Sequence, residues 1–515
     1  MSPTLLYSNT ISILCLIQLL ITFVRFLYTY THILPHDPWE SEINLNGKQT
    51  KTPSLSIIIP SRDEPLETIK MTIESAISVD YPENKVKIIL TDNSSENSRY
   101  RLTANYFNGL HKIHNNIHFI HRNTTIGFKA GNLDFALEQF KSDYVLFLDI
   151  DNTCGSYGKK IMKYIQYLER NQSCAYIQFK NQPRNSKQNY VSQIFSSSMR
   201  IYKAAEEARS NTNNGFAYFQ GHSCLWRDSS IRMITPLANR FANKMIVAED
   251  LHAAVRIHIQ GMTGKQSDEY GTFYAPITIT SAEKMLTRWV YGKQQVIFKT
   301  FRELLCLLKR LKTRMVTLNS LSRAYLDVSN AILPYLVFID YSISDSMTSL
   351  YSATTLMIDA VFFNVILSAA LSNRNIFEQR VRQSLLSSWS LVCFNAVEWC
   401  SQVKAVFTFF LQLDYNWVPT QKIIKTQLKR STAAPNKKQV LTTYFINLVY
   451  TKREIYFSKL LPLFNMILIV YISLTLGRLD VIIAAAPLIY YSFVLITFAM
   501  LEERSREKNV IEENN

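Results

Sequence analysis

The sequence lacks the cysteine patterns of disulfide-rich secreted domains and of zinc modules. Its seven cysteines are scattered over 515 residues, and none forms a C-x-x-C pair. Several of them, such as Cys15 and Cys393, lie within apolar segments. We therefore expect reduced thiols, with neither a disulfide framework nor a structural zinc site.

The chain also lacks the marks of a cleaved secretory signal. No basic residue precedes the first apolar run, ISILCLIQLLITFVRFLYTY (residues 11–30), and no small-residue cleavage site follows it. The run is long enough to cross a bilayer as a helix. We expect residues 1–33 to be a retained transmembrane anchor.

Acidic residues are fewer than basic ones, which leaves a net charge of +16. Such a balance fits nucleic-acid binding, but it also fits a membrane protein whose Lys and Arg lie on the cytoplasmic side. The basic clusters stand beside apolar runs, so we expect membrane lipids and no nucleic acid as partners. These clusters are Lys309, Arg310, Lys312 and Arg314, then Arg374, Arg380 and Arg382, then Arg504, Arg506 and Lys508.

Later apolar runs predict further spans near 326–343, 348–371, 460–477 and 480–501, about five in all with the anchor. The segment 385–412 contains Glu398 and Lys404, and we place it at the membrane interface. Residues 281–320 have amphipathic helical spacing, which predicts interfacial helices; a covered surface helix is the alternative. The expected units are therefore 1–33, a catalytic domain 54–280, interfacial helices 281–320, a transmembrane pair 324–371, interfacial helices 372–458, a second pair 459–501 and a charged cytoplasmic tail 502–515.

Residues 54–280 have the texture of an α/β domain. Short runs such as SLSIIIP, KVKIILTD and DYVLFLDID alternate with helical patterns such as LETIKMTIESAISV. This alternation predicts a mostly parallel, doubly wound sheet. Ligands of such sheets bind at the carboxyl ends of the strands.

Acidic side chains follow two of these strands. Asp149 and Asp151 end VLFLDID, where their oxygens suit a hard cation on a diphosphate. Asp92 ends KIILTD. Acids in a solvated turn at the end of a strand would give the same sequence pattern, so neither pattern identifies a binding site by itself.

Three further groups carry chemistry. Lys129 lies at a glycine turn that opens a helix, which suits an anion. Glu249 and Asp250 open another helical pattern, where acids also complement the helix dipole. Arg288 and Trp289 are adjacent on the amphipathic stretch, where a membrane-interface anchor is the alternative.

The order of these motifs is more specific than any one of them. It runs IIIPSRDE, TDNSS, FKAGNL, DID, FQGHS, AED and TRW, followed by paired spans with WVPTQK between them. In this order the sequence resembles the family 2 glycosyltransferases, and within them the membrane-embedded cellulose synthase group, whose relatives are the chitin and hyaluronan synthases. The resemblance covers nearly all of the chain from Pro53 to about Leu501.

The resemblance implies a nucleotide-diphospho-sugar transferase domain between membrane helices, with Asp250 as general base. It implies Mg²⁺ or Mn²⁺ as cofactor, held by Asp149 and Asp151. The residues implied for the donor are Glu64, Asp92, Lys129, Asp149 and Arg288. Those implied for the acceptor are Phe219, Gly221, His222, Glu249 and Trp289. A loop that closes over the substrate is implied at 417–422, with Trp417, Thr420 and Lys422.

Four positions depart from the family pattern. Thr91 stands for the first of two paired aspartates, Met285 for the Gln of Q-x-x-R-W, and His222 for a small hydroxyl residue. The closing loop reads WVPT, with Pro419 where the family has valine. These departures bear on base recognition, acceptor contact and processivity, and sugar transfer itself does not depend on them.

The function implied is an inverting transfer from a nucleotide sugar, with UDP-glucose expected first, onto a growing β-linked polysaccharide that leaves through the protein's own helices. The alternative is a non-processive transferase that glycosylates a membrane lipid. A transporter or scaffold with an inert domain would require a broken metal or base position, yet all three aspartates are present. The expected location is the plasma membrane, or the inner membrane of a bacterium, with several spans and a cytoplasmic catalytic domain.

Overall fold

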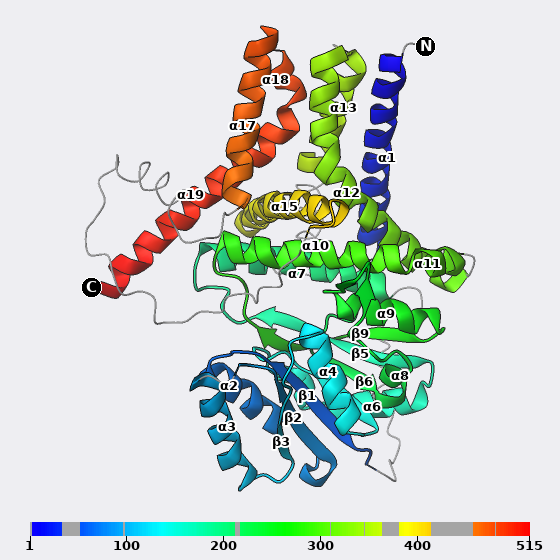
Figure 1. Ribbon diagram of the computed structural model, residues 1–515, viewed down its shortest axis with the longest axis vertical. Coiled ribbons are helices and arrows are strands. Elements are labelled where there is room, and N and C mark those ends of the chain that lie inside the picture. Colours follow the sequence, from blue (N-terminus) through cyan, green and yellow to red (C-terminus); the bar gives the residue numbers. More distant parts are fainter. Residues whose placement is uncertain are drawn as a thin grey trace.

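Figure 1 shows the protein as a computed structural model. The residues it describes are 3–32, 52–95, 98–211, 217–308, 311–344, 346–362, 381–413, 457–478 and 480–514. An α/β domain forms one end, and upright helices form the other (Figure 1).

A seven-stranded sheet forms the centre of the α/β domain, in the order β3-β2-β1-β4-β6-β5-β9. The pairs β1–β2, β2–β3, β1–β4 and β5–β9 are parallel, and β6 is antiparallel to β4 and β5. The prediction of a mostly parallel sheet is confirmed. The strands are β1 (Leu55–Ser61), β2 (Val86–Asp92), β3 (Ile117–His121), β4 (Tyr144–Phe147), β5 (Cys174–Pro183), β6 (Cys224–Arg227) and β9 (Thr263–Phe273), with a separate hairpin of β7 (Arg240–Phe241) and β8 (Lys244–Met245).

Helices cover both faces of this sheet. Their bounds are α2 (Leu66–Ile77), η2 (Glu83–Lys85), α3 (Ser98–His111), α4 (Phe128–Gln139), α5 (Gly155–Gly158), α6 (Ile161–Arg170), α8 (Asp228–Met233) and α9 (Glu249–Ile259). A further helix, α7 (Tyr190–Asn211), lies at the end of the domain that faces the upright helices (Figure 1). Because strand side chains alternate, Ile57 and Ile59 join the core under α2, α3 and α6, whereas Ile58 joins the core under α4, α8 and α9. Each fully buried isoleucine contributes about 1.5–3 kcal/mol relative to an exposed one. These β-branched residues therefore hold β1 at the centre of the domain.

Two long helices lie between the sheet domain and the upright helices. They are α10 (Ile279–Lys299) and α15 (Val381–Phe410), which contact each other along their length (Figure 1). The Thr278 side chain caps α10 by accepting a hydrogen bond from the Ser281 amide. Most of α10 is buried among the described residues, and its position at the membrane interface stays a prediction. The next helix, α11 (Phe301–Leu308), exposes Phe301 and Leu305, and its interfacial position stays a prediction.

The upright helices are α1 (Pro3–His32), α12 (Leu311–Ser344), α13 (Met347–Met357) with η3 (Ile358–Phe362), α17 (Phe457–Leu476), α18 (Val481–Ala484) and the first part of α19 (Ala486–Asn514). Within the described residues, three stretches are long and apolar enough to cross a membrane: 6–25, 321–344 and 486–503. A shorter apolar helix covers 460–476. The expected span 348–371 lies partly outside the described residues, and the expected span 480–501 is divided between α18 and α19. The predicted count of about five therefore stays a prediction.

Candidate active site

A cavity of about 260 Å³ opens where β1, β2 and β4 end. The amino ends of α4 and α9 also meet there, together with the middle of α10. Its chemistry-bearing lining residues are Ser61, Arg62, Glu64, Asn93, Lys129, Asn132, Asp149, Asp151, Asn152, Asn185, Gln220, His222, Glu249, Asp250, Tyr274, Met285, Arg288 and Trp289. The structure thus gathers residues that are up to 228 positions apart in the chain, from Ser61 to Trp289.

The two acids after β4 both line this cavity. The backbone amide of Leu148 continues the sheet by donating to the carbonyl of Ile58, and the chain then turns, with the Asn152 amide donating to the Asp149 carbonyl. Arg184 donates to the backbone carbonyl of Asp151 and lies over the Tyr274 ring. The loop that carries both carboxylates is therefore held by the sheet on one side and by Arg184 on the other.

Lys129 connects the acids of the cavity. Its Nζ lies 2.6 Å from Oδ1 of Asp149 and 3.8 Å from Oε1 of Glu249, and it donates to the Gly221 carbonyl at 2.9 Å. Burial by itself lowers the pKa of Lys129, but the charges of Asp149 and Glu249 outweigh it and raise that pKa. The ammonium is therefore held in its charged form at the end of β4.

Glu249 and Asp250 form the first turn of α9. Burial raises the pKa of Glu249 to about 7, with a further increase from the charge of Asp250 and an opposing effect from Lys129. Burial also raises the pKa of Asp250, against the opposing charges of Lys129 and Arg288 and a hydrogen bond from the Leu251 amide. Two carboxyl groups with raised pKa values in one cavity are typical of a site that exchanges protons near neutral pH.

The loop before β6 passes between Lys129 and Asp250. Gly221 has a left-handed φ of +80°, and a Cβ there would lie 2.8 Å from Nζ of Lys129 and 3.2 Å from Oδ2 of Asp250. Only glycine fits this position without moving one of the two. His222 lines the cavity, whereas Phe219 is buried in the core against Phe147, Tyr176 and Trp226.

α10 supplies the wall opposite β4. Met285, Arg288 and Trp289 line the cavity from one face of this helix. The Trp289 side chain is 39% exposed, which leaves a large aromatic surface for a ligand. The other face of α10 packs on α15.

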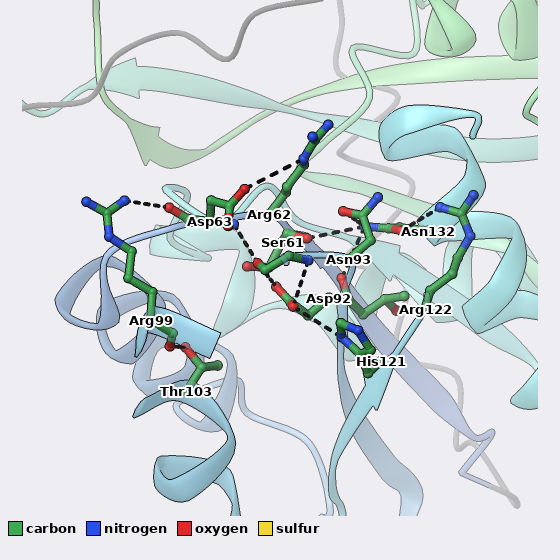
Figure 2. A network of polar contacts seen from close by, with 12 residues as sticks. Ser61, Arg62, Asp63, Asp92, Asn93, Arg99, Thr103, His121, Arg122 and Asn132 are labelled. Carbon is green, nitrogen blue, oxygen red and sulfur yellow. Dashed lines mark hydrogen bonds and ion pairs between the residues drawn. The ribbon is translucent and has the colours of Figure 1, made fainter. Parts of the chain in front are cut away.

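Asp92 lies behind the cavity and does not line it. Figure 2 shows its carboxylate beside His121, whose Nδ1 is 3.5 Å away, and Ser94 donates to it from both amide and hydroxyl. Its neighbour Asn93 lines the cavity instead. Burial raises the pKa of Asp92, although the bonds from Ser94 and the charge of His121 oppose this. Of the remaining predicted residues, Glu64 lies in the cavity wall, and Trp417, Thr420 and Lys422 fall outside the described residues.

Residues 56–232 match the family described as Glycosyl transferase family 2. The chain carries a family 2 glycosyltransferase domain. Its curated relatives include a cellulose synthase catalytic subunit (UDP-forming) of Komagataeibacter xylinus, 26% identical over 139 residues, which cover 27% of this chain and 17% of that protein. Another is glucomannan 4-beta-mannosyltransferase 7 of Arabidopsis thaliana, 22% identical over 302 residues, which cover 56% of this chain and 53% of that protein. The matches therefore span between about a sixth and about half of these relatives.

Among solved structures, the chain is similar to the mannosyltransferase PcManGT of Pyrobaculum calidifontis, solved with GDP-Man and Mn²⁺. The TM-score is 0.50 at 14% identity, over 78% of this chain and all of that one. This likeness supports a GT-A-like fold for the family 2 domain, the α/β fold of nucleotide-sugar transferases.

The residues present in the family 2 domain fit a divalent cation. Asp149 and Asp151 offer carboxylate oxygens in one cavity, and the Lys129 ammonium already rests as a cation against the first of them. The described residues contain no group of three or more His, Cys, Asp or Glu placed to hold a metal. Mg²⁺ is bound in many enzymes by one or two carboxylates, with water and substrate phosphates completing the shell, so two acids suffice.

Sequence reasoning missed the amides of the site. Asn132 on α4 donates from Nδ2 to Ser61, Thr91 and Asn93, which ties the ends of β1 and β2 together, and its Oδ1 accepts from Arg122 at 2.9 Å (Figure 2). Their position could have indicated two of these amides, because Asn93 and Asn152 directly follow the acids Asp92 and Asp151 in the sequence.

Proposed function

We propose that this protein is an inverting, metal-dependent glycosyltransferase that extends a β-linked polysaccharide from a nucleotide sugar. The observation that carries the proposal is the meeting of Lys129, Asp149, Glu249, Asp250 and Arg288 in one cavity at the carboxyl edge of the sheet. Two cations suit a diphosphate, and two buried acids of raised pKa suit the removal of a proton.

The donor is a nucleoside diphosphate sugar, with UDP-glucose expected first. The K. xylinus relative is named as UDP-forming, the plant relative as a mannosyltransferase, and PcManGT was solved with GDP-Man. Glu64, Asp92 and Asn93 stand at the ends of β1 and β2, where the nucleotide of such a donor binds in doubly wound sheets. Lys129 and Arg288 contact the diphosphate in our proposal.

A divalent cation held by Asp149 and Asp151 would offset the negative charge that builds on the diphosphate as the sugar bond breaks. Asp250 accepts the proton of the acceptor hydroxyl, which then attacks the anomeric carbon opposite the leaving group. A single displacement inverts this carbon, so an α-linked donor gives a β-linkage. Trp289 offers its ring face to the apolar face of the acceptor sugar, and the Gly221–His222 loop holds that sugar beside Asp250.

The membrane helices complete the proposal. The upright helices are the anchor and the transmembrane pairs, which lie in the plasma membrane or in a bacterial inner membrane. The family 2 domain is on the cytoplasmic side. The polymer leaves through the helices above α10 and α15. The rival acceptor is a membrane lipid, and the product distinguishes the two.

The test is a product assay on purified full-length protein in lipid vesicles, with Mg²⁺ or Mn²⁺ and several labelled nucleotide sugars in turn. We expect label in a long polymer for one donor. Asp250→Asn should abolish this label while donor binding persists. Label in the lipid extract would show that the acceptor is a lipid and not a polysaccharide. Sugar transfer that persists in Asp250→Asn would show that Asp250 is not the base.

A further inference from the structure

Asn152 and His222 contact each other at the floor of the cavity. Asn152 follows the two strand-end acids and is 1% exposed, and His222 follows Gly221, whose φ is left-handed. Nδ2 of Asn152 lies 2.6 Å from Nδ1 of His222. Both residues line the cavity. The resemblance assigned no role to Asn152, so this contact is new information about the acceptor side.

The surrounding amides decide the direction of this hydrogen bond. Nδ2 of Asn152 also lies 3.4 Å from Oδ1 of Asn181 and 3.3 Å from Oγ of Ser223. Asn181 is oriented by its own bonds, because its Oδ1 accepts from Ser223 at 2.8 Å and its Nδ2 donates to the Phe179 carbonyl. Reversing the Asn152 amide would place its oxygen against the Asn181 oxygen, two acceptors without a proton between them.

Asn152 is therefore the donor and Nδ1 of His222 the acceptor. A neutral imidazole that accepts at Nδ1 carries its proton on Nε2, so Nε2 is a donor. The ring is thus fixed in one tautomer by a residue that does not titrate.

The backbone of the same loop is held separately. Gln178, fully buried on β5, accepts from the Gln220 amide at 2.9 Å and donates to the carbonyls of His222 at 2.9 Å and Ser223 at 3.1 Å. The loop position and the ring tautomer of His222 therefore depend on different side chains. A change at Asn152 can alter the ring while Gln178 keeps the loop in place.

We propose that Asn152 is a positioning residue that holds His222 neutral with its proton on Nε2, and that His222 donates this proton in a hydrogen bond to a hydroxyl oxygen of the acceptor. The proposal rests on the proposed function and adds the chemistry of the acceptor end. A neutral N–H donor recognises an uncharged hydroxyl, whereas an imidazolium would favour a phosphate. The acceptor group that this pair recognises is therefore an uncharged hydroxyl.

The tautomer can be measured without turnover. Full-length protein in lipid bilayers, labelled with ¹⁵N-histidine, is compared by NMR at neutral pH with His222→Gln, and the difference spectrum gives the His222 signals. We expect an unprotonated Nδ1 and a protonated Nε2. Asn152→Asp offers an acceptor instead of a donor and should move the proton to Nδ1. A protonated Nδ1 in the unchanged protein, or an unmoved proton in Asn152→Asp, overturns the pairing.

A kinetic comparison tests the role in acceptor binding. His222→Ala and Asn152→Ala should each raise the acceptor KM about tenfold, the size of one lost hydrogen bond, and the double variant should lose little more than either single one. The donor KM should change less than about twofold, which distinguishes lost positioning from a disturbed loop at Asp151. The glutamine amide of His222→Gln both accepts and donates hydrogen bonds, so this variant should raise the acceptor KM less than His222→Ala does.

Two kinetic results would overturn the role: equal rises in donor and acceptor KM, or full additivity of the two single variants. A polyprenyl phosphate that serves as acceptor better than a neutral oligosaccharide would overturn the hydroxyl assignment. Because the spectrum needs no sugar transfer, the tautomer and the proposed function stand or fall separately.

Discussion

The ammonium nitrogen of Lys129 lies 2.6 Å from Oδ1 of Asp149, so a positive charge already rests on the first acid after β4. The same nitrogen donates to the carbonyl of Gly221. Lys129 thereby links the proposed metal loop to the proposed acceptor loop, and both should respond when this contact is broken.

Asp149→Asn tests the metal side of this link. The variant removes one carboxylate ligand and the partner of Lys129, so we expect donor affinity in Mg²⁺ or Mn²⁺ to fall at least about tenfold. With a chelator present, the donor affinity of the variant should equal the donor affinity of the unchanged protein without metal. Calorimetric titration of each nucleotide sugar, with and without metal, measures both.

Asp143→Asn is the matched control for Asp149→Asn. Asp143 precedes the same strand at its opposite end, where its side chain accepts from the Ser54 amide and hydroxyl. Asp143→Asn changes the formal charge by the same amount as Asp149→Asn and should leave donor affinity unchanged. Unaltered affinity in Asp149→Asn would remove the metal assignment.

Gly221→Ala tests how tightly the loop must approach Lys129 and Asp250. The new methyl would meet both side chains, and φ of +80° adds backbone strain of about 1–2 kcal/mol. Gly261 has almost the same φ, +84°, and a Cβ at that position would meet nothing within 4 Å. Gly261→Ala therefore carries the strain without the contact.

We expect both glycine variants to lose similar thermal stability, and only Gly221→Ala to lose more than about tenfold in transfer rate. Melting temperature and initial rate, measured on the same vesicle preparations, provide the comparison. Equal rates in the two variants would show that the close approach to Lys129 is dispensable.

The sequence predicted the family 2 domain well because its signals are local. Ile57, Ile58 and Ile59 mark a buried strand, Asp92 ends β2, and Asp149 and Asp151 come shortly after β4. The fold then places the loop after β4 beside the first turns of α4 and α9, so Asp149, Lys129 and Asp250 line one cavity, and their roles stay predictions.

Long-range contacts explain what could not be predicted. The apolar stripe of α10 looks the same whether lipid or α15 covers it, because both partners are apolar. Asp92 ends a strand as predicted, yet its carboxylate is bonded to Ser94 and lies beside His121 instead of lining the cavity. The bond from Asn152 to His222 joins residues 70 positions apart, and no periodicity encodes it.

Glu249 gives a prediction for the pH dependence of stability. Its pKa rises from 4.5 to about 7 in the folded protein, chiefly through burial. Between these values the folded state holds a proton that the unfolded state has released, so stability falls as pH rises from about 4.5 to 7. Glu249→Gln cannot titrate and should flatten this part of the profile.

Melting temperatures across this pH range, at a fixed scan rate, measure the effect of Glu249→Gln. Glu269→Gln is the control with the opposite sign: burial raises the pKa of Glu269, but the hydrogen bonds from Lys160 and Ser156 and the charge of Lys160 together outweigh burial and lower that pKa. Its stabilising contribution is present above the unfolded value of 4.5 and is lost only on further acidification. A slope that persists in Glu249→Gln would place the raised pKa on another group.

Trp289 tests whether α10 binds the acceptor. Stacking of an aromatic ring contributes about 0.5–1.5 kcal/mol beyond burial, so Trp289→Ala should raise the acceptor KM about three- to tenfold, and Trp289→Phe should do so less. Hydrolysis of the donor by water needs no acceptor, so its rate should not change and the ratio of transfer to hydrolysis should fall.

Trp389 on α15 donates to the Tyr190 hydroxyl outside the cavity, so Trp389→Ala should lower thermal stability and leave the ratio of transfer to hydrolysis unchanged. If transfer and hydrolysis fall together in Trp289→Ala, the ring supports the fold of the site and the stacking role is wrong.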